Sequence, residues 1–285
     1  MMYASLSLKA INPARENFRL LQKLGLRPEI SFESGWTNYS VQEHKTMAAI
    51  IADHFPGAAV HLPYGGLDFG RGDNFLAQKE ALAKAAEIAS FYRPHHVVAH
   101  PSFRSLTDSV LGVKKYPGFT RDNLDGLSQI PAQNWLNRSK TVWSEVSRTL
   151  GCLLYLENTH EHSPLPLIHL LEILGDQAGF CLDFGHWFHY AMGRHWDNLD
   201  FWLERIGPFL AHVHVHDNNG EADQHLALGQ GLIDYDKIRL ELASRDLRPN
   251  MTIENYQAAD LALSYETLTQ RPLWSDPAKV FTCAS

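Results

Sequence analysis

Short β-rich runs alternate with longer helix-like runs along the whole chain. The short runs predict strands at Tyr3–Ser7, Glu29–Glu33, Ala58–Leu62, His96–His100, Leu153–Glu157, Gly179–Asp183, Ala211–His216 and Met251–Asn255. The longer runs predict helices at Pro13–Leu24, Val41–His54, Phe75–Tyr92, Trp135–Leu150, Leu165–Leu174, Leu199–Ile206, Tyr235–Ala243 and Asp260–Thr269. Alternating strands and helices indicate a parallel sheet. Eight such units predict an α/β protein with a single closed (β/α)₈ TIM barrel; a doubly wound open sheet is the alternative, and it usually has fewer strands.

One connection is longer than this pattern needs. About fifty residues separate the fourth and fifth predicted strands, and only the later part has a helical pattern. We therefore expect a long loop insertion at about 103–131, which is either functional or a surface excursion without catalytic meaning. No linker or repeat interrupts the chain, so residues 1–285 are predicted to form one domain.

Composition narrows the class of protein. Of 285 residues, 45% are hydrophobic and 20% are charged, which is typical of a globular protein and excludes intrinsic disorder. No apolar run approaches the roughly 20 residues that a membrane helix needs, and no secretory signal is visible. The three cysteines, Cys152, Cys181 and Cys283, are too few and too widely spaced for a disulfide framework or a cysteine zinc site, so a cytoplasmic location is expected. A net charge of -7 disfavours broad nucleic-acid binding, although not a locally basic groove.

Candidate chemistry gathers at the ends of the predicted strands. In a (β/α)₈ barrel the active site is built at the carboxyl ends of the strands. The ends of strands three to eight, and the segments after strands six and seven, supply His61, His100, Glu157, Asp183, His186, His214, His216, Asp223, His225 and Glu254. Burying so many carboxylates and imidazoles together is costly unless cations pair with them. Nitrogen and oxygen ligands without thiolate suit Zn²⁺, Mn²⁺, Co²⁺ or Fe²⁺, so we predict a divalent-metal site.

The sixteen histidines differ in what their positions imply. His212, His214 and His216 alternate along strand seven and so face the same way, and only the one at the right height would be a ligand. Histidines on predicted helices and loops, such as His44, are expected to be solvated.

The order of several motifs resembles a known superfamily. The motifs are Leu156-Glu157-Asn158-Thr159, Asp183-Phe184-Gly185-His186, His214-Val215-His216-Asp217-Asn218, Asp223-Gln224-His225 and Gly229-Gln230-Gly231. In this order they resemble the xylose-isomerase-like barrels, which include sugar isomerases and epimerases, inosose dehydratases and endonuclease IV. The resemblance implies a core metal set of Glu157, Asp183, His214 and Glu254. It favours His214 over His216 because the family's ligand precedes the aspartate by three residues.

The isomerase and epimerase branch implies one metal and two catalytic carboxylates. Glu157 and Glu254 would bind the metal and act as acid and base on opposite faces of a small sugar, polyol or sugar phosphate. The expected substrate contacts are His61, Tyr64, His100, His186 and Trp187. The aromatic residues Trp36, Tyr64, Trp187, Phe188 and Tyr190 are expected at the mouth. The arginine that ketose 3-epimerases carry after strand seven is missing here.

The endonuclease IV branch is the alternative. This chain resembles that family at nine positions, namely His61, His100, Glu157, Asp183, His186, His214, Asp223, His225 and Glu254. The family uses such a set to hold three zinc ions and cleave DNA beside an abasic site. His61, His100, His186, Asp223 and His225 would then be additional metal ligands, giving about one to three ions per chain across the two branches. The family's glycine-rich opening after strand one is absent, as is its threonine-cysteine pair near Asp183. We therefore predict a sugar-type isomerase or epimerase first, a multi-zinc phosphodiesterase second, and a barrel that has lost its chemistry third.

Overall fold

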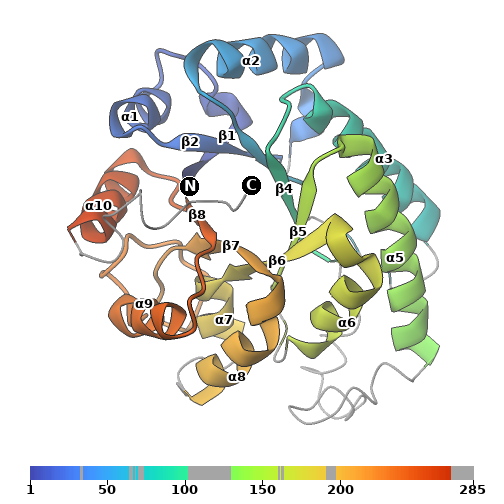
Figure 1. The fold of residues 1–285 in the computed structure, drawn as a ribbon. Coiled ribbons are helices and arrows are strands. Elements are labelled where there is room, and N and C mark those ends of the chain that lie inside the picture. The colour runs from blue at the N-terminus through green and yellow to red at the C-terminus, as the bar shows by residue number, and fades with distance from the viewer. Residues whose placement is uncertain are drawn as a thin grey trace.

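Eight parallel strands close into a barrel in the computed structural model, which describes residues 1–32, 35–63, 67, 69, 74–101, 130–159, 161, 164–190 and 197–270 (Figure 1). The strands are β1 (Met2–Ser7), β2 (Arg27–Ser31), β3 (Ala59–His61), β4 (His96–Ala99), β5 (Leu153–Glu157), β6 (Ala178–Asp183), β7 (Leu210–Val215) and β8 (Asn250–Ile253). Each strand pairs with the next in sequence, and β8 pairs with β1. The predicted (β/α)₈ barrel is thus confirmed, and the open sheet is excluded.

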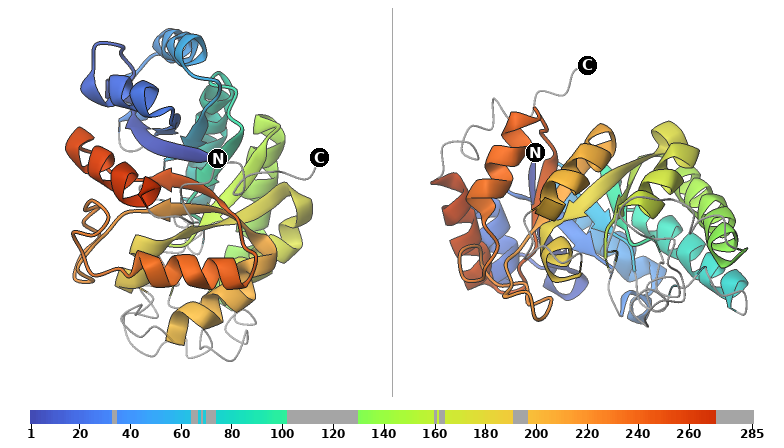
Figure 2. Two further views of the ribbon diagram at one scale, coloured as in Figure 1. Left: turned by 60° about the vertical axis from the view of Figure 1, so that its left-hand side comes forward. Right: turned by 90° about the horizontal axis from the view of Figure 1, so that it is seen from below.

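Helices surround the barrel, as two further views show (Figure 2). They are α1 (Glu16–Leu24), α2 (Val41–His54), α3 (Phe75–Ser90), α5 (Ile130–Leu150), α6 (Leu165–Leu174), α7 (Phe184–Tyr190), α8 (Asp197–Ile206), α9 (Tyr235–Ser244) and α10 (Ala258–Thr269). The sequence did not predict α7, which follows β6 without a connecting loop. Among the described residues, no helix combines the length and the apolar character needed to cross a membrane.

Local sequence accounts for several helix ends. Ser40 and Glu43 form a capping box that starts α2, since each side chain bonds the backbone N–H of the other. Asp234 accepts from the Lys237 backbone N–H at the start of α9. Gly25, at φ 68°, ends α1 in the left-handed region that glycine adopts without strain. The predicted insertion at 103–131 falls largely outside the described residues, apart from its last two positions, which open α5.

The main hydrophobic core lies between the strands and the helices. It contains the strand residues that point away from the barrel axis, such as Val60, Val97 and Leu156, all fully buried. Among the described residues, a small second hydrophobic cluster lies inside the barrel and is formed by Val98, Tyr155 and Cys181. The barrel axis is therefore lined mainly by polar side chains.

One histidine on a helix was wrongly expected to be solvated. His44 on α2 is fully buried, and its two ring nitrogens lie 3.1 Å from the Tyr92 hydroxyl and 3.0 Å from the Trp36 carbonyl oxygen. Both ring nitrogens have hydrogen-bond partners, and these compensate for the loss of water when the ring is buried.

Candidate metal centre

Four side chains converge at the carboxyl end of the barrel. Glu157 ends β5, Asp183 ends β6, His214 lies on β7 and Glu254 follows β8. One ligand atom from each lies within 4.8 Å of the other three. The Nδ1 atom of His214 is 3.2 Å from Glu254 Oε2, 3.4 Å from Glu157 Oε1 and 3.8 Å from Asp183 Oδ2. These four residues are called the central cluster, and they are the core metal set that the resemblance implied.

The facing atoms of the central cluster have no hydrogen-bond partner within the described part of the chain. They are Glu157 Oε1, Asp183 Oδ2, His214 Nδ1 and Glu254 Oε2, all buried. Buried polar atoms are almost always partnered, so three unpartnered carboxylate oxygens and an unpartnered imidazole nitrogen that face one another indicate a missing positive charge. Three carboxylates and an imidazole are suitable ligands for a divalent cation. The residues present therefore fit a metal ion.

The electrostatics of the central cluster agree with this conclusion. Burial alone would raise the pKa of Glu157, but the facing imidazoles of His214 and His100 outweigh it, and this pKa lies well below its usual range. The pKa of Glu254 is about 2 for the same reasons, with His214 and His225 as the main opposing groups. Both carboxylates therefore stay ionised at neutral pH and attract positive charge.

The side chain of Asn158 fixes the distance between the ends of β5 and β6. Its Oδ1 accepts from the Asp183 backbone N–H at 2.8 Å, and its Nδ2 donates to the Asp183 carbonyl oxygen at 3.0 Å. Asp183 Oδ1 accepts from the His186 backbone N–H at 2.5 Å. Asn158 thus holds the two carboxylate-bearing strand ends in register, which explains its place in the Glu157-Asn158 motif.

The carboxylate of Glu157 faces two groups of histidines. Its Oε2 lies 2.9 Å from His61 Nε2 and 3.1 Å from His100 Nε2. Its Oε1 lies 3.4 Å from His214 Nδ1 and 3.2 Å from His186 Nδ1. Burial would lower the pKa of His61, but Glu157 raises it to about 9, whereas for His100 burial dominates and the pKa falls. This arrangement would allow Glu157 to bridge two cations.

An outer cluster lies beside the central one and consists of His216, Asp223 and His225, whose ligand atoms lie within 4.8 Å of one another. Asp223 Oδ2 is 3.1 Å from His186 Nε2 and 3.3 Å from His225 Nε2, and its Oδ1 is 3.5 Å from His216 Nε2. Gly185 makes room for this cluster, because a Cβ atom there would lie 1.9 Å from the His216 ring. The structure thus places His214 in the central cluster and His216 in the outer one.

A cavity of about 210 Å³ opens above both clusters. It is lined by Ser31, His61, His100, Thr159, His186, Tyr190, Asp223, His225, Glu254 and Tyr256. Among the described residues that line it there is no lysine or arginine. Tyr256, which is 46% exposed, packs its ring on His225 with centroids 4.7 Å apart; it was not predicted from the sequence, although it follows the Glu254 motif directly.

The predicted aromatic mouth needs correction. Trp187 is fully buried in the hydrophobic core and does not line the cavity, and Phe188 is also buried there. Trp36 lines a neighbouring cavity of about 320 Å³ instead. Only Tyr190 of the predicted aromatics lines the cavity over the clusters, and Tyr64 lies outside the described residues.

Two interior residues, Glu29 and His96, were also missed, and a third, His212, was considered only beside His214 and His216 as a possible ligand. Glu29 on β2, His96 on β4 and His212 on β7 are buried below the central cluster. The sequence signal for Glu29 was its spacing of two residues from Ser31, because residues two apart in a strand face the same side of the sheet. These residues lie inside the barrel, one layer of side chains below the strand ends from which the site was predicted.

Comparison with known proteins concerns the family and the fold of the chain. A family model described as "Xylose isomerase-like TIM barrel" matches residues 21–271. The uncharacterized protein MJ1614 of Methanocaldococcus jannaschii is 28% identical over 143 residues, which are 49% of this chain and 54% of that protein. The chain thus spans about half the length of the curated relatives it matches.

Two solved structures show the same fold. A D-tagatose 3-epimerase-like protein is 21% identical, with a TM-score of 0.67 over 94% of this chain and 96% of that chain. Endonuclease IV of Thermus thermophilus is 18% identical, with a TM-score of 0.61 over 95% of this chain and 99% of that chain. Both enzyme types considered from the sequence are therefore built on this fold.

Proposed function

This chain belongs to the xylose isomerase-like TIM barrel family, and we propose that it is a divalent-metal-dependent enzyme that transfers a proton on a small sugar, polyol or sugar phosphate. The observation that carries the proposal is the central cluster, whose four unpartnered buried atoms face one another beneath a small cavity. Zn²⁺, Mn²⁺, Co²⁺ and Fe²⁺ all suit these ligands.

Glu157 and Glu254 are the proposed acid and base. Glu157 ends β5 and Glu254 follows β8, and these strands are separated in the barrel by β6 and β7. Glu254 lines the cavity, whereas Glu157 is fully buried beneath it. The low pKa of each carboxylate keeps both ionised at neutral pH, which is the form that a base needs. When bound, the metal would polarise a substrate carbonyl or hydroxyl and so make the neighbouring C–H proton more acidic.

The described lining of the cavity contains no lysine or arginine, and its cationic groups at neutral pH are imidazoles such as that of His61. Its described residues offer hydroxyl groups and imidazoles, such as those of Thr159, Tyr190 and His186, but no permanently charged cation for a phosphate. His61 and His100 lie at the same wall and could hydrogen-bond sugar hydroxyls when they are not metal ligands. We therefore rank ketoses and inososes above their phosphates.

The test is isotope exchange on the metal-loaded enzyme. Ketoses and inososes are incubated in D₂O, and proton NMR records the loss of signal at carbons next to the carbonyl. We expect exchange with the wild type and none with Glu254→Gln, whose circular dichroism should be unchanged. Unchanged turnover in the Glu254→Gln variant would contradict the assignment of the site.

A multi-metal phosphodiesterase is the second candidate, and one observation favours it. Glu157 faces the His61 and His100 pair through one oxygen and the central cluster through the other, while Asp223 links His186 with the outer cluster. Several cations held in this way could activate a water and stabilise charge on a phosphoryl group.

Metal stoichiometry and DNA cleavage test this second candidate. Two or three ions per chain, cleavage of a duplex with one abasic site, and fewer ions in Asp223→Ala would support it. Unaltered metal content in Asp223→Ala would rule it out.

A further inference from the structure

A buried carboxylate lies inside the barrel, one layer below the central cluster. Glu29 on β2 is 2% exposed and pairs in register with Ser5 of β1 and Ala59 of β3. A carboxylate at this depth is costly unless its oxygens are compensated. Its contacts therefore indicate what it does.

Both oxygens of Glu29 are engaged by neighbouring strands. Oε1 lies 3.0 Å from His214 Nε2, which is an ion-pair distance, although the two atoms do not have the angles of a hydrogen bond in this structure. Oε2 accepts a hydrogen bond of 2.8 Å from the Thr252 hydroxyl of β8. That hydroxyl is also 2.8 Å from His212 Nε2.

The contact with Glu29 determines which nitrogen of His214 carries hydrogen. Carboxylates are ordinarily ionised at neutral pH and then only accept hydrogen bonds, so the position of Glu29 Oε1, 3.0 Å from Nε2, favours hydrogen on Nε2 in the neutral ring. Nδ1 is then left with its lone pair, and Nδ1 is the atom that faces Glu157, Asp183 and Glu254. Without Glu29, either nitrogen could hold the proton.

We propose that Glu29 is a positioning residue that orients His214 and fixes its tautomer for metal binding. The inference rests on the proposed metal at the central cluster. Histidines that bind a metal usually donate their other ring N–H to a carboxylate or carbonyl, and loss of that partner weakens metal affinity by about 10- to 100-fold.

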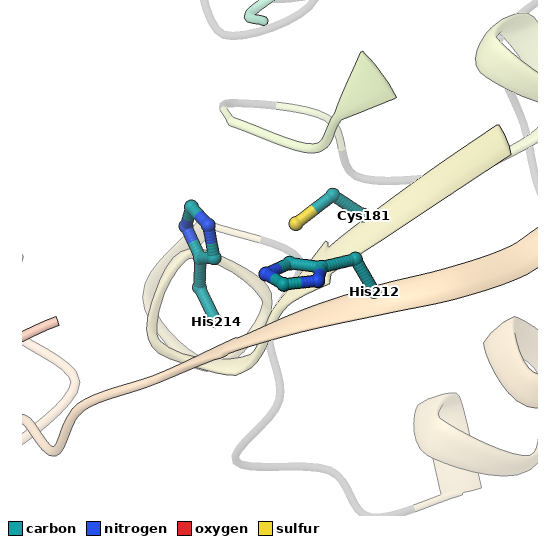
Figure 3. A group of neighbouring side chains, drawn as sticks. All are labelled: Cys181, His212 and His214. Carbon is teal, nitrogen blue, oxygen red and sulfur yellow. The ribbon is translucent and has the colours of Figure 1, made fainter. Parts of the chain in front are cut away.

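The interior could instead hold an ion of its own, but its contacts argue against this. Glu29, His96 and His212 form one group of suitable atoms, and Cys181, His212 and His214 form another (Figure 3). The Thr252 hydroxyl already lies at hydrogen-bond distance from both Glu29 Oε2 and His212 Nε2. His212 belongs to both groups.

The experiment measures zinc affinity directly. Purified protein is stripped with a chelator and titrated with Zn²⁺ against a chromophoric competitor. Glu29→Met, which removes both acceptors at similar size, should bind zinc about 10- to 100-fold more weakly than the wild type. Glu29→Gln keeps an acceptor oxygen for His214 and should recover part of this loss. Tyr3→Phe, which removes a hydroxyl elsewhere in the barrel interior, is the matched control and should bind as the wild type does.

Long-range ¹H–¹⁵N NMR of the zinc-loaded wild type supplies a second readout that does not depend on a variant folding. A hydrogen on His214 Nε2 supports the proposal, and a hydrogen on Nδ1 overturns it. Zinc affinity of a folded Glu29→Met variant within about threefold of wild type would also overturn it. If the wild type binds no divalent metal, the proposed function and this inference both fail. If the wild type binds zinc and the Glu29→Met variant binds it equally well, only this inference fails.

Discussion

The two faces of each barrel strand differ in chemistry. On β5, Leu154 and Leu156 point into the main hydrophobic core, whereas Tyr155 and Glu157 point to the barrel axis. Branched aliphatic side chains usually dominate the interior of such barrels. Here much of the interior is given to Glu29, His96, His212 and Thr252, all buried. The difference indicates that the outer face supplies stability and that the inner face supports a charged site.

The largest expected effect comes from the inner face. Glu157→Gln removes the carboxylate that faces both the central cluster and the pair of His61 and His100. We expect bound metal to fall sharply and activity to fall by about 10²- to 10⁴-fold, because both metal binding and proton transfer are affected. Elemental analysis and a kinetic assay measure the two losses. A variant with full metal content would contradict this role for the inner face.

Leu156, next to Glu157 on β5, tests the face of the strand that packs against the helices. Leu156 is fully buried in the main core, so Leu156→Ala should lower the free energy of unfolding by about 2–5 kcal/mol. Urea unfolding measures this change. Metal content per folded chain should match the wild type, and a large loss of metal from folded protein would show that the two faces are not separable.

The metal-free site should make stability depend on pH. In the folded protein Glu157 raises the pKa of His61 from 6.5 to about 9. This contribution is fully present below about pH 6.5 and is lost as pH rises through about 9, so it should amount to about 1–3 kcal/mol between pH 6.5 and 9.5. Urea unfolding of chelator-treated protein at both pH values measures it, and His61→Asn should reduce the difference. An equal pH dependence in the His61→Asn variant would contradict the assignment of this effect to His61.

The smallest effect is expected at the helical surface. Arg245 on the outside of the barrel pairs with Asp200 at 2.9 Å and with Glu241. Exposed ion pairs contribute little, so Arg245→Ala should change the free energy of unfolding by at most about 1 kcal/mol and leave metal content unchanged. Thermal unfolding with parallel metal analysis checks both parts, and a drop in metal content would mean that the outer surface reaches the site.

The barrel and the meeting of its strand ends were predictable from short-range pattern, whereas the four residues of the central cluster were selected from the candidates by the resemblance to the superfamily. Alternating element types specify parallel pairing, and residues at strand ends such as Glu157 and Asp183 must meet at one end of a closed barrel. Glu29 was missed because the predicted strand began there, which placed it away from the mouth. Its role depends on a contact with His214, far away in sequence.

The misplaced aromatics have a local cause. Helix α7 begins directly after β6, so neighbouring residues point in different directions around the helix. His186 and Tyr190, four residues apart, both line the cavity, whereas Trp187 is turned into the core. Because no helix was predicted over residues 184–190, their side chains could not be assigned to different faces, and all the aromatic residues among them were expected at the mouth.

Metal content per chain tests the central claim most directly. Protein purified without chelators is analysed by elemental mass spectrometry, before and after incubation with Zn²⁺, Mn²⁺, Co²⁺ or Fe²⁺, beside the Glu157→Gln variant. We predict about one to three tightly held ions per wild-type chain and fewer in the variant. Folded wild-type protein that holds none of these ions, before or after incubation, would contradict the account.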